Sequence, residues 1–100
     1  MTNKGTHTLE VKLVSTKGHC NANHKLGDTY LIRGDTEKLD LGNGGICLHA
    51  LAAMLPKLFA MRYGSQFWWS ADPDVVRANC PDAENPHVFE IRRVPGAARP

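Results

Sequence analysis

Hydrophobic and polar residues alternate along two stretches of the chain, residues 7–16 and 87–94, and a period of two is typical of a strand with one buried face. Residues 29–33 are rich in β-forming side chains and have a Gly-Asp pair on each side. Residues 75–79 follow an Asp-Pro-Asp turn and have the length and composition of a further strand. The pattern therefore predicts four strands, of which the last two form a hairpin.

Residues 46–63 are apolar almost without interruption, which predicts a helix. A helix that is apolar on all sides is buried on all sides, so we expect a curved sheet to cradle it or a second subunit to cover it. Pro56 lacks an amide hydrogen and clashes with the preceding turn, which predicts a break near Leu55. The run is too short and too interrupted for a membrane span.

Together these elements predict an α+β fold, with a mainly antiparallel sheet of about four strands packed on one broken apolar helix. The chain has 100 residues, close to the commonest size of one domain. We therefore expect residues 1–100 to form a single domain with a core that spans about residues 7–94. Residues 95–100 contain only Pro, Gly, Ala and Arg, which predicts a flexible tail.

The net charge of the chain is small, +2, and its basic residues are scattered except for Arg92, Arg93 and Arg99. A nucleic-acid-binding surface needs a clustered basic face with stacking aromatic residues, so no nucleic-acid partner is expected. No membrane partner is expected either. Residues 1–7 are polar and lack the apolar centre of a secretory signal, so we expect a cytoplasmic protein.

The connection between the first two predicted strands is a long polar loop, residues 18–28, which contains His19, Cys20 and His24. Long ordered loops in small domains are often functional. The chain has three cysteines, and we expect no export signal, which favours reduced thiols, metal ligands or reactive cysteines over a disulfide framework. This loop is therefore the first candidate for chemistry.

Thiolate and imidazole groups are the ligands that suit zinc, and a structural zinc site takes four of them. Three thiolates and one imidazole would come from Cys20, His24, Cys47 and Cys80. The cysteines lie at the edges of predicted elements, whereas a cysteine that only fills a core usually lies inside one. Without a Cys-x-x-Cys motif, the ligands would converge from three loops. We predict a site for zinc or another transition metal, structural if four protein ligands close it and catalytic if one position is open.

Two other functions stay open. Cys47 follows a glycine-rich segment at the start of the predicted helix, where free amides and the helix dipole favour an anion, so a cysteine-dependent enzyme could use its thiolate. His19 is then the candidate acid or base, although a solvated loop histidine fits equally well. Alternatively, the apolar helix surface would recruit a partner protein or a second copy of the chain, and a small-molecule ligand also fits between the loops.

Several short motifs carry a resemblance to a known family. They are Gly18-His19-Cys20, His24-Lys25-Leu26-Gly27-Asp28, Gly45-Ile46-Cys47, Arg62-Tyr63-Gly64, Asp72-Pro73-Asp74 and Cys80-Pro81-Asp82. In this combination, over about residues 8–94, the chain resembles a family of small, mostly prokaryotic proteins described as uncharacterised. The resemblance implies that the three cysteines and His24 belong to one shared signature, and it implies no settled activity. The chain departs from the usual pattern at Asn21, Asn23 and Leu48-His49, and in a longer polar insert at residues 35–43.

Overall fold

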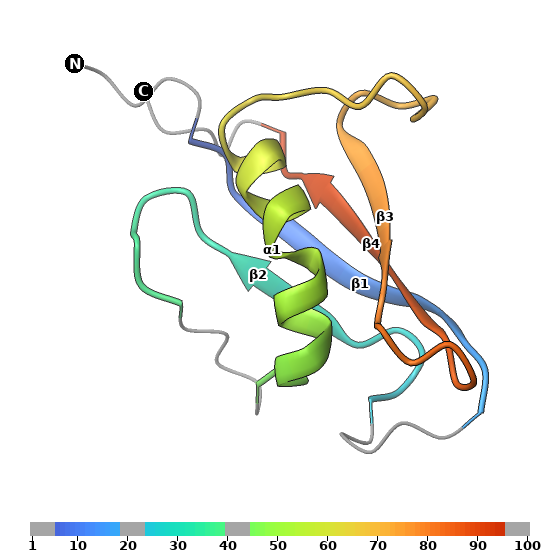
Figure 1. Cartoon of the computed structure of the whole chain (residues 1–100). Coiled ribbons are helices and arrows are strands. Elements are labelled where there is room, and N and C mark those ends of the chain that lie inside the picture. The colour runs from blue at the N-terminus through green and yellow to red at the C-terminus, as the bar shows by residue number, and fades with distance from the viewer. Residues whose placement is uncertain (1–5, 19–23, 40–44, 96–100) are drawn as a thin grey trace.

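In the part of the chain that the structure describes, four strands form one antiparallel sheet in the order β2-β1-β4-β3, and one helix packs against it (Figure 1). This computed structural model describes residues 6–18, 24–39 and 45–95. The elements are β1 (Leu9–Thr16), β2 (Thr29–Ile32), α1 (Leu48–Arg62), β3 (Val75–Asn79) and β4 (His87–Arg93). The α+β class predicted from the sequence is confirmed, and the strands lie close to the expected positions.

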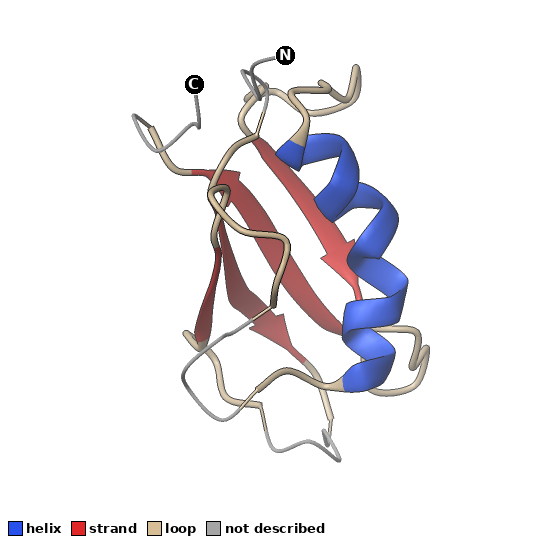
Figure 2. Cartoon of the chain, turned by 90° about the vertical axis from the view of Figure 1, so that its left-hand side faces the viewer, coloured by secondary structure: helices blue, strands red, loops and turns tan. Residues whose placement is uncertain are grey.

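The core lies between α1 and one face of the sheet, as Figure 2 shows. Every second residue of the central strands points into it, because successive side chains of a strand face opposite sides. The fully buried side chains include Leu9, Val11 and Leu13 of β1, Phe89 and Ile91 of β4, and Met54 and Met61 of α1. The alternation in the sequence thus decides which face of each strand meets the helix.

α1 is one continuous helix, and the break expected near Leu55 is absent. Pro56 lies inside the helix on its exposed side. A proline leaves the carbonyl four residues earlier without its helical donor, but a carbonyl on the solvent side can accept a hydrogen bond from water. The helix continues because the missing hydrogen bond falls where water can replace it.

The sheet covers only one side of α1, in contrast to the expected cradle (Figure 2). Met54 and Met61 are buried against the strands, whereas Leu48, Phe59 and Tyr63 are exposed. Burial in the core of this domain therefore does not account for the apolar sequence of the outer side. No helix in the described part of the chain has both the length and the apolarity to span a membrane.

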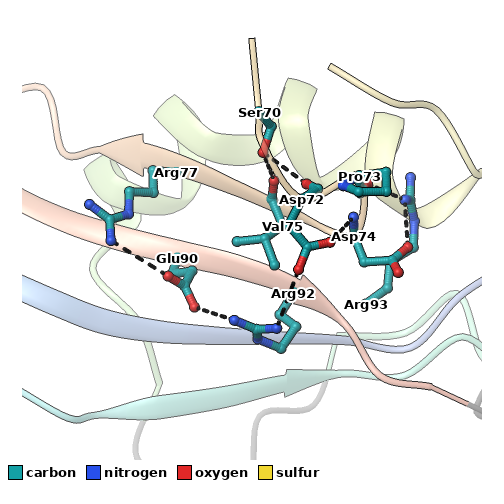
Figure 3. Close-up of polar contacts among 9 residues, drawn as sticks. All are labelled: Ser70, Asp72, Pro73, Asp74, Val75, Arg77, Glu90, Arg92 and Arg93. Atoms are coloured by element: carbon teal, nitrogen blue, oxygen red, sulfur yellow. Dashed lines mark hydrogen bonds and ion pairs between the residues drawn. The ribbon is translucent and has the colours of Figure 1, made fainter. Parts of the chain in front are cut away.

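A buried arginine holds the C-terminal end of α1. Arg93 of β4 donates from Nε to the carbonyl oxygen of Met61 (2.9 Å), and from its terminal nitrogens to the carbonyl oxygens of Pro73 (2.7 Å) and Ser65. A terminal nitrogen of Arg93 also lies 3.3 Å from the carboxylate of Asp74 (Figure 3). The last carbonyls of a helix lack helical donors and carry partial negative charge, so a cation beside them stabilises this end.

The sheet face away from α1 carries charged side chains. Arg77, Glu90 and Arg92 form a row of ion pairs on β3 and β4, and Asp72 extends the row (Figure 3). The N to O distances along it are 3.8, 3.0 and 4.0 Å. Exposed pairs of this kind contribute little to stability, so the row marks a solvated face.

Candidate functional site

The predicted cysteine and histidine ligands belong to segments that meet at one end of the domain. β1 ends and β2 begins at this end, and β3 ends and β4 begins there as well, because both pairs are antiparallel and β1 also pairs antiparallel with β4 (Figure 1). The N-terminus of α1 lies at the same end (Figure 1). The topology therefore brings together three segments that are distant in the sequence.

Gly18 joins the first of these segments to the loop between β3 and β4. Its φ of +76° is left-handed, and a Cβ at this position would collide with the side-chain oxygen of Asn85. Glycine is thus required both by the backbone conformation and by the close approach. The neighbouring Lys17 N–H donates to the carbonyl oxygen of Pro86 (3.0 Å). The start of the loop that contains Cys20 is therefore fixed against the loop that follows Cys80.

His24 joins the same long loop to the start of α1. Its side chain is only 6% exposed, and the backbone N–H of Cys47 donates to its Nε2 (2.8 Å). Nδ1 lies 2.8 Å from the hydroxyl of Tyr30 and 3.8 Å from the carboxylate of Asp28. The ring also packs edge-on against Tyr30 and Phe89. His24 is therefore a buried link between loop, sheet and helix.

The Cys47 amide fixes the tautomer of His24. A backbone N–H can only donate, so Nε2 holds the lone pair and the ring proton is on Nδ1, where it donates to Tyr30. Neither ring nitrogen then has a free lone pair for a metal ion. To act as the predicted ligand, Nε2 of His24 would have to exchange the Cys47 amide for the metal.

Cys47 and Cys80 are free thiols, both partly buried against the core. Cys47 is the N-cap residue of α1, and its side chain makes no capping hydrogen bond. Sγ of Cys80 lies 3.7 Å from the carbonyl oxygen of Asn85. Within residues 6–18, 24–39 and 45–95, no three His, Cys, Asp or Glu side chains are close enough to hold a metal ion. The three predicted ligands in these ranges, His24, Cys47 and Cys80, are therefore not grouped as a metal site in this structure, and a metal ion would have to draw them together.

Two predicted site residues, His19 and Cys20, lie outside the described residues. A site that includes Cys20 therefore stays a prediction, and so does a catalytic role for His19. The flanking residues are described: Gly18 contacts the loop after Cys80, and His24 contacts Cys47. The flanks of Cys20 thus connect its loop to the segments that carry both other cysteines.

Asp82 holds the loop that follows Cys80. Its Oδ1 accepts from the backbone N–H groups of Glu84 and Asn85 (3.1 Å each), and its Oδ2 accepts from the side-chain amide of Asn85 (3.2 Å). The side-chain amide of Asn85, followed by the Asn85 backbone N–H, holds the pKa of Asp82 below its ordinary value of 3.8. Asp82 therefore stabilises a turn that positions Cys80.

We expect the stabilisation from Asp82 to disappear in acid. A carboxyl group whose pKa is lower in the folded chain stabilises the folded state above its unfolded pKa, and this contribution is lost as the pH falls through the folded pKa. As the pH falls below about 4, the Tm of the wild type should therefore drop more steeply than that of Asp82→Asn, which keeps the shape of the side chain. Circular dichroism melts in small pH steps measure the difference. Parallel curves for the two proteins would contradict the assignment.

The outer side of α1 carries a continuous apolar stripe. Six exposed side chains form this stripe, which we call the outer face of α1: Leu48, Ala52, Leu55, Pro56, Phe59 and Tyr63. They recur three or four positions apart, so they line one side of the helix. Leu48 is 74% exposed, and Phe59 and Tyr63 are each 54% exposed. None of the six is charged, whereas the solvent side of a helix is normally polar.

A cavity of about 130 Å³ lies beside the outer face of α1, between the helix and residues 33–39. Its helix wall is apolar except for Arg62, whose terminal nitrogens donate to the carbonyl oxygens of Arg33 and Thr36 (2.8 Å each). The buried Nε of Arg62 has no acceptor in the part of the chain that the structure describes. This cavity is a candidate place for the small-molecule ligand, which stays a prediction.

Two residues that organise the cysteine end were not singled out from the sequence. The β-forming composition of residues 29–33 marks Tyr30 as part of a strand but carries no signal for its bond to His24. Asn85 lies in a turn sequence, and its contact with Gly18 joins two loops that are far apart in the chain. Long-range pairs of this kind leave no local pattern that a single sequence could reveal.

No protein-family model, curated protein or solved structure matches the chain. The family resemblance therefore stays an expectation. The function has to be argued from the residues and their contacts.

Proposed function

We propose that the cysteine end of the domain is a centre for one transition-metal ion, with zinc the ion best suited to thiolate ligands. Its ligands would be the thiolates of Cys20, Cys47 and Cys80, with His24 as the fourth. The observation that supports the proposal is the position of the residues on either side of Cys20. Gly18 lies against the loop that follows Cys80, and His24 accepts a hydrogen bond from Cys47.

Such a centre would tie together three loops that lie at the edges of the core. The ligands are scattered in the unfolded chain, so metal binding adds directly to the free energy of folding. A domain of 100 residues has a small core, which makes this contribution valuable. The ion would thus act first as a structural clip.

The ring of His24 decides whether the centre is closed. If Nε2 leaves the Cys47 amide and binds the ion, four protein ligands complete a structural site. If Nε2 keeps the amide, the fourth position is open to water or to a small substrate, which is the arrangement of catalytic sites. The proposal therefore describes one metal centre in which Nε2 of His24 binds either the metal ion or the Cys47 amide.

Coupling between the cysteines tests the proposal. Cys20→Ser and Cys80→Ser should each abolish most metal binding, and the double variant should cost little further stability, because the loss of one ligand already empties the site. Thermal unfolding of the wild type and the three variants, with and without a chelator, gives the comparison. Chelator should lower the Tm of the wild type alone.

Independent cysteines would behave differently. If each thiol is only a small buried hydrophobic group, each change should cost about 1 kcal/mol, and the two costs should add. The chelator would then leave every Tm unchanged. Additive losses that do not depend on chelator would refute the shared centre.

A cysteine-dependent enzyme is the second candidate, and the position of Cys47 favours it. Cys47 caps α1, where the helix dipole favours an anion, and the first turn of α1 contains no acidic residue. The two candidates differ in the need for metal. A metal-free protein in which Cys47 reacts faster than the other two cysteines would favour the enzyme.

A further inference from the structure

We propose that the outer face of α1 is covered by a second copy of this chain, with the two α1 helices packed antiparallel about a two-fold axis near Leu55 and Pro56. This interface is separate from the cysteine centre and does not depend on a metal. The proposal follows from the chemistry of the face, from its length and from the sizes of its side chains.

The chemistry of the face restricts the partner. All six side chains are uncharged, and five of them are large apolar or aromatic groups or proline. A charged or polar surface that docked here would lose its hydration without gaining hydrogen bonds or ion pairs in return. The partner surface must itself be apolar and elongated. The outer face of α1 meets both conditions, and a two-fold homodimer uses the same patch on both subunits.

The sizes of the side chains favour the antiparallel arrangement. Around a two-fold axis near the middle of the helix, residues at equal distances on either side face each other across the interface. The facing pairs are Leu48 with Tyr63, Ala52 with Phe59, and Leu55 with Pro56. Phe59 of each copy then fills the space left by the small Ala52 of the other, which is how well-packed helix pairs alternate large and small residues.

A parallel arrangement would pack poorly. It would place Phe59 opposite Phe59 and Ala52 opposite Ala52, which crowds one level of the interface and leaves a gap at another. The antiparallel pair avoids both defects. Only the antiparallel arrangement predicts that position 52 of one copy meets position 59 of the other.

The size of the interface sets the expected strength. α1 has 15 residues and is about 22 Å long, so a helix pair buries less than the roughly 800 Å² per partner of a standard interface. The pair would also shield from water the carbonyl of Ala52, which Pro56 leaves without its helical donor. We therefore expect weak, reversible dimers with a dissociation constant on the order of 10 µM. The dimer should be visible between about 1 µM and 1 mM protein.

Charged substitutions at the two facing positions test the arrangement. Ala52→Glu and Phe59→Lys are both at exposed positions, so each variant should fold with a Tm near that of the wild type. Each variant alone should dimerise at least about tenfold more weakly, because a charge would be buried against an apolar side chain. Sedimentation velocity over the concentration range measures the association.

An equimolar mixture of the two variants should regain the dimer. One contact then joins the introduced glutamate of one copy to the introduced lysine of the other, while the second contact keeps the native pair of Phe59 and Ala52. The matched control is Ala52→Lys mixed with Phe59→Lys, which places two lysines opposite each other and should stay monomeric. The difference between the two mixtures reports the antiparallel register.

Three results would overturn the proposal. A wild type that is monomeric up to about 1 mM would exclude the second copy as the occupant. A dimer that neither substitution weakens would place the interface elsewhere. Single variants that both lose the dimer, without recovery in the mixture of opposite charges, would exclude the antiparallel pairing. All three outcomes are independent of the metal content of the protein.

Discussion

Replacement of Arg93 by methionine should lower the free energy of unfolding by about 3–5 kcal/mol. The side chain is buried, and it donates to the carbonyl oxygens of Met61, Pro73 and Ser65. Methionine keeps much of the volume and the apolar stem but removes every donor. The end of α1 and the turn before β3 would then lose their common anchor. Urea denaturation of Arg93→Met and the wild type measures the loss.

Arg92→Met is the matched control. Arg92 is the preceding residue of β4, its side chain is 47% exposed, and its ion pairs are on the solvated face of the sheet. Exposed pairs are weak, so this change should alter the free energy of unfolding by no more than about 0.5 kcal/mol. Equal losses in the two variants would mean that the hydrogen bonds of Arg93 to α1 do not carry the stability assigned to them.

His24→Ala should lower the free energy of unfolding by about 2–4 kcal/mol. The change opens a cavity against Phe89 and leaves the Cys47 N–H without its acceptor. His49→Ala, at an exposed position of α1, is the control and should be nearly neutral. Chemical denaturation in the presence of a chelator isolates the structural part of the effect.

The same variant separates the two states of the centre. If His24 is the fourth ligand, His24→Ala should also lose most of its metal. If Nε2 keeps the Cys47 amide, the variant should lose stability and keep the metal. A variant as stable as the wild type under both conditions would contradict the described contacts of His24.

Much of the fold could be predicted because its strands carry local patterns. Alternation in residues 7–16 and 87–94 identifies β1 and β4 and the face that each turns to the core. The helix is equally clear from composition. The expected break near Leu55 was wrong because sequence does not tell on which side of the helix Pro56 lies, and the exposed side tolerates it.

The surfaces that bury the sides of α1 could be predicted only in part. The apolar sequence of α1 predicts burial on all sides, but it does not identify the surface that buries each side. The sheet covers one side and leaves the outer face exposed, so a second subunit on that face stays a prediction. Arg93 shows the same limit, because its burial depends on contacts with α1 that no local pattern encodes.

The candidate site shows how far loop positions can be read from a sequence. Cysteines at element edges predict loops, and antiparallel pairing brings loops to a common end of the sheet, as the positions of Cys47 and Cys80 indicate. The bond between His24 and the Cys47 amide could not be predicted, because it joins a side chain to a backbone group across a long stretch of chain. That bond would place a metal ion in competition with the Cys47 amide for Nε2 of His24.

The most direct test of the central claim is the metal content of untagged protein, purified gently without chelators and measured by elemental analysis alongside protein concentration. If the metal centre exists, the protein should contain about one equivalent of a transition metal per chain, with zinc predominant. Cys20→Ser and Cys80→Ser should then lose this metal, whereas the exposed His49→Ala should retain it. Less than about a tenth of an equivalent in the wild type would contradict the metal centre.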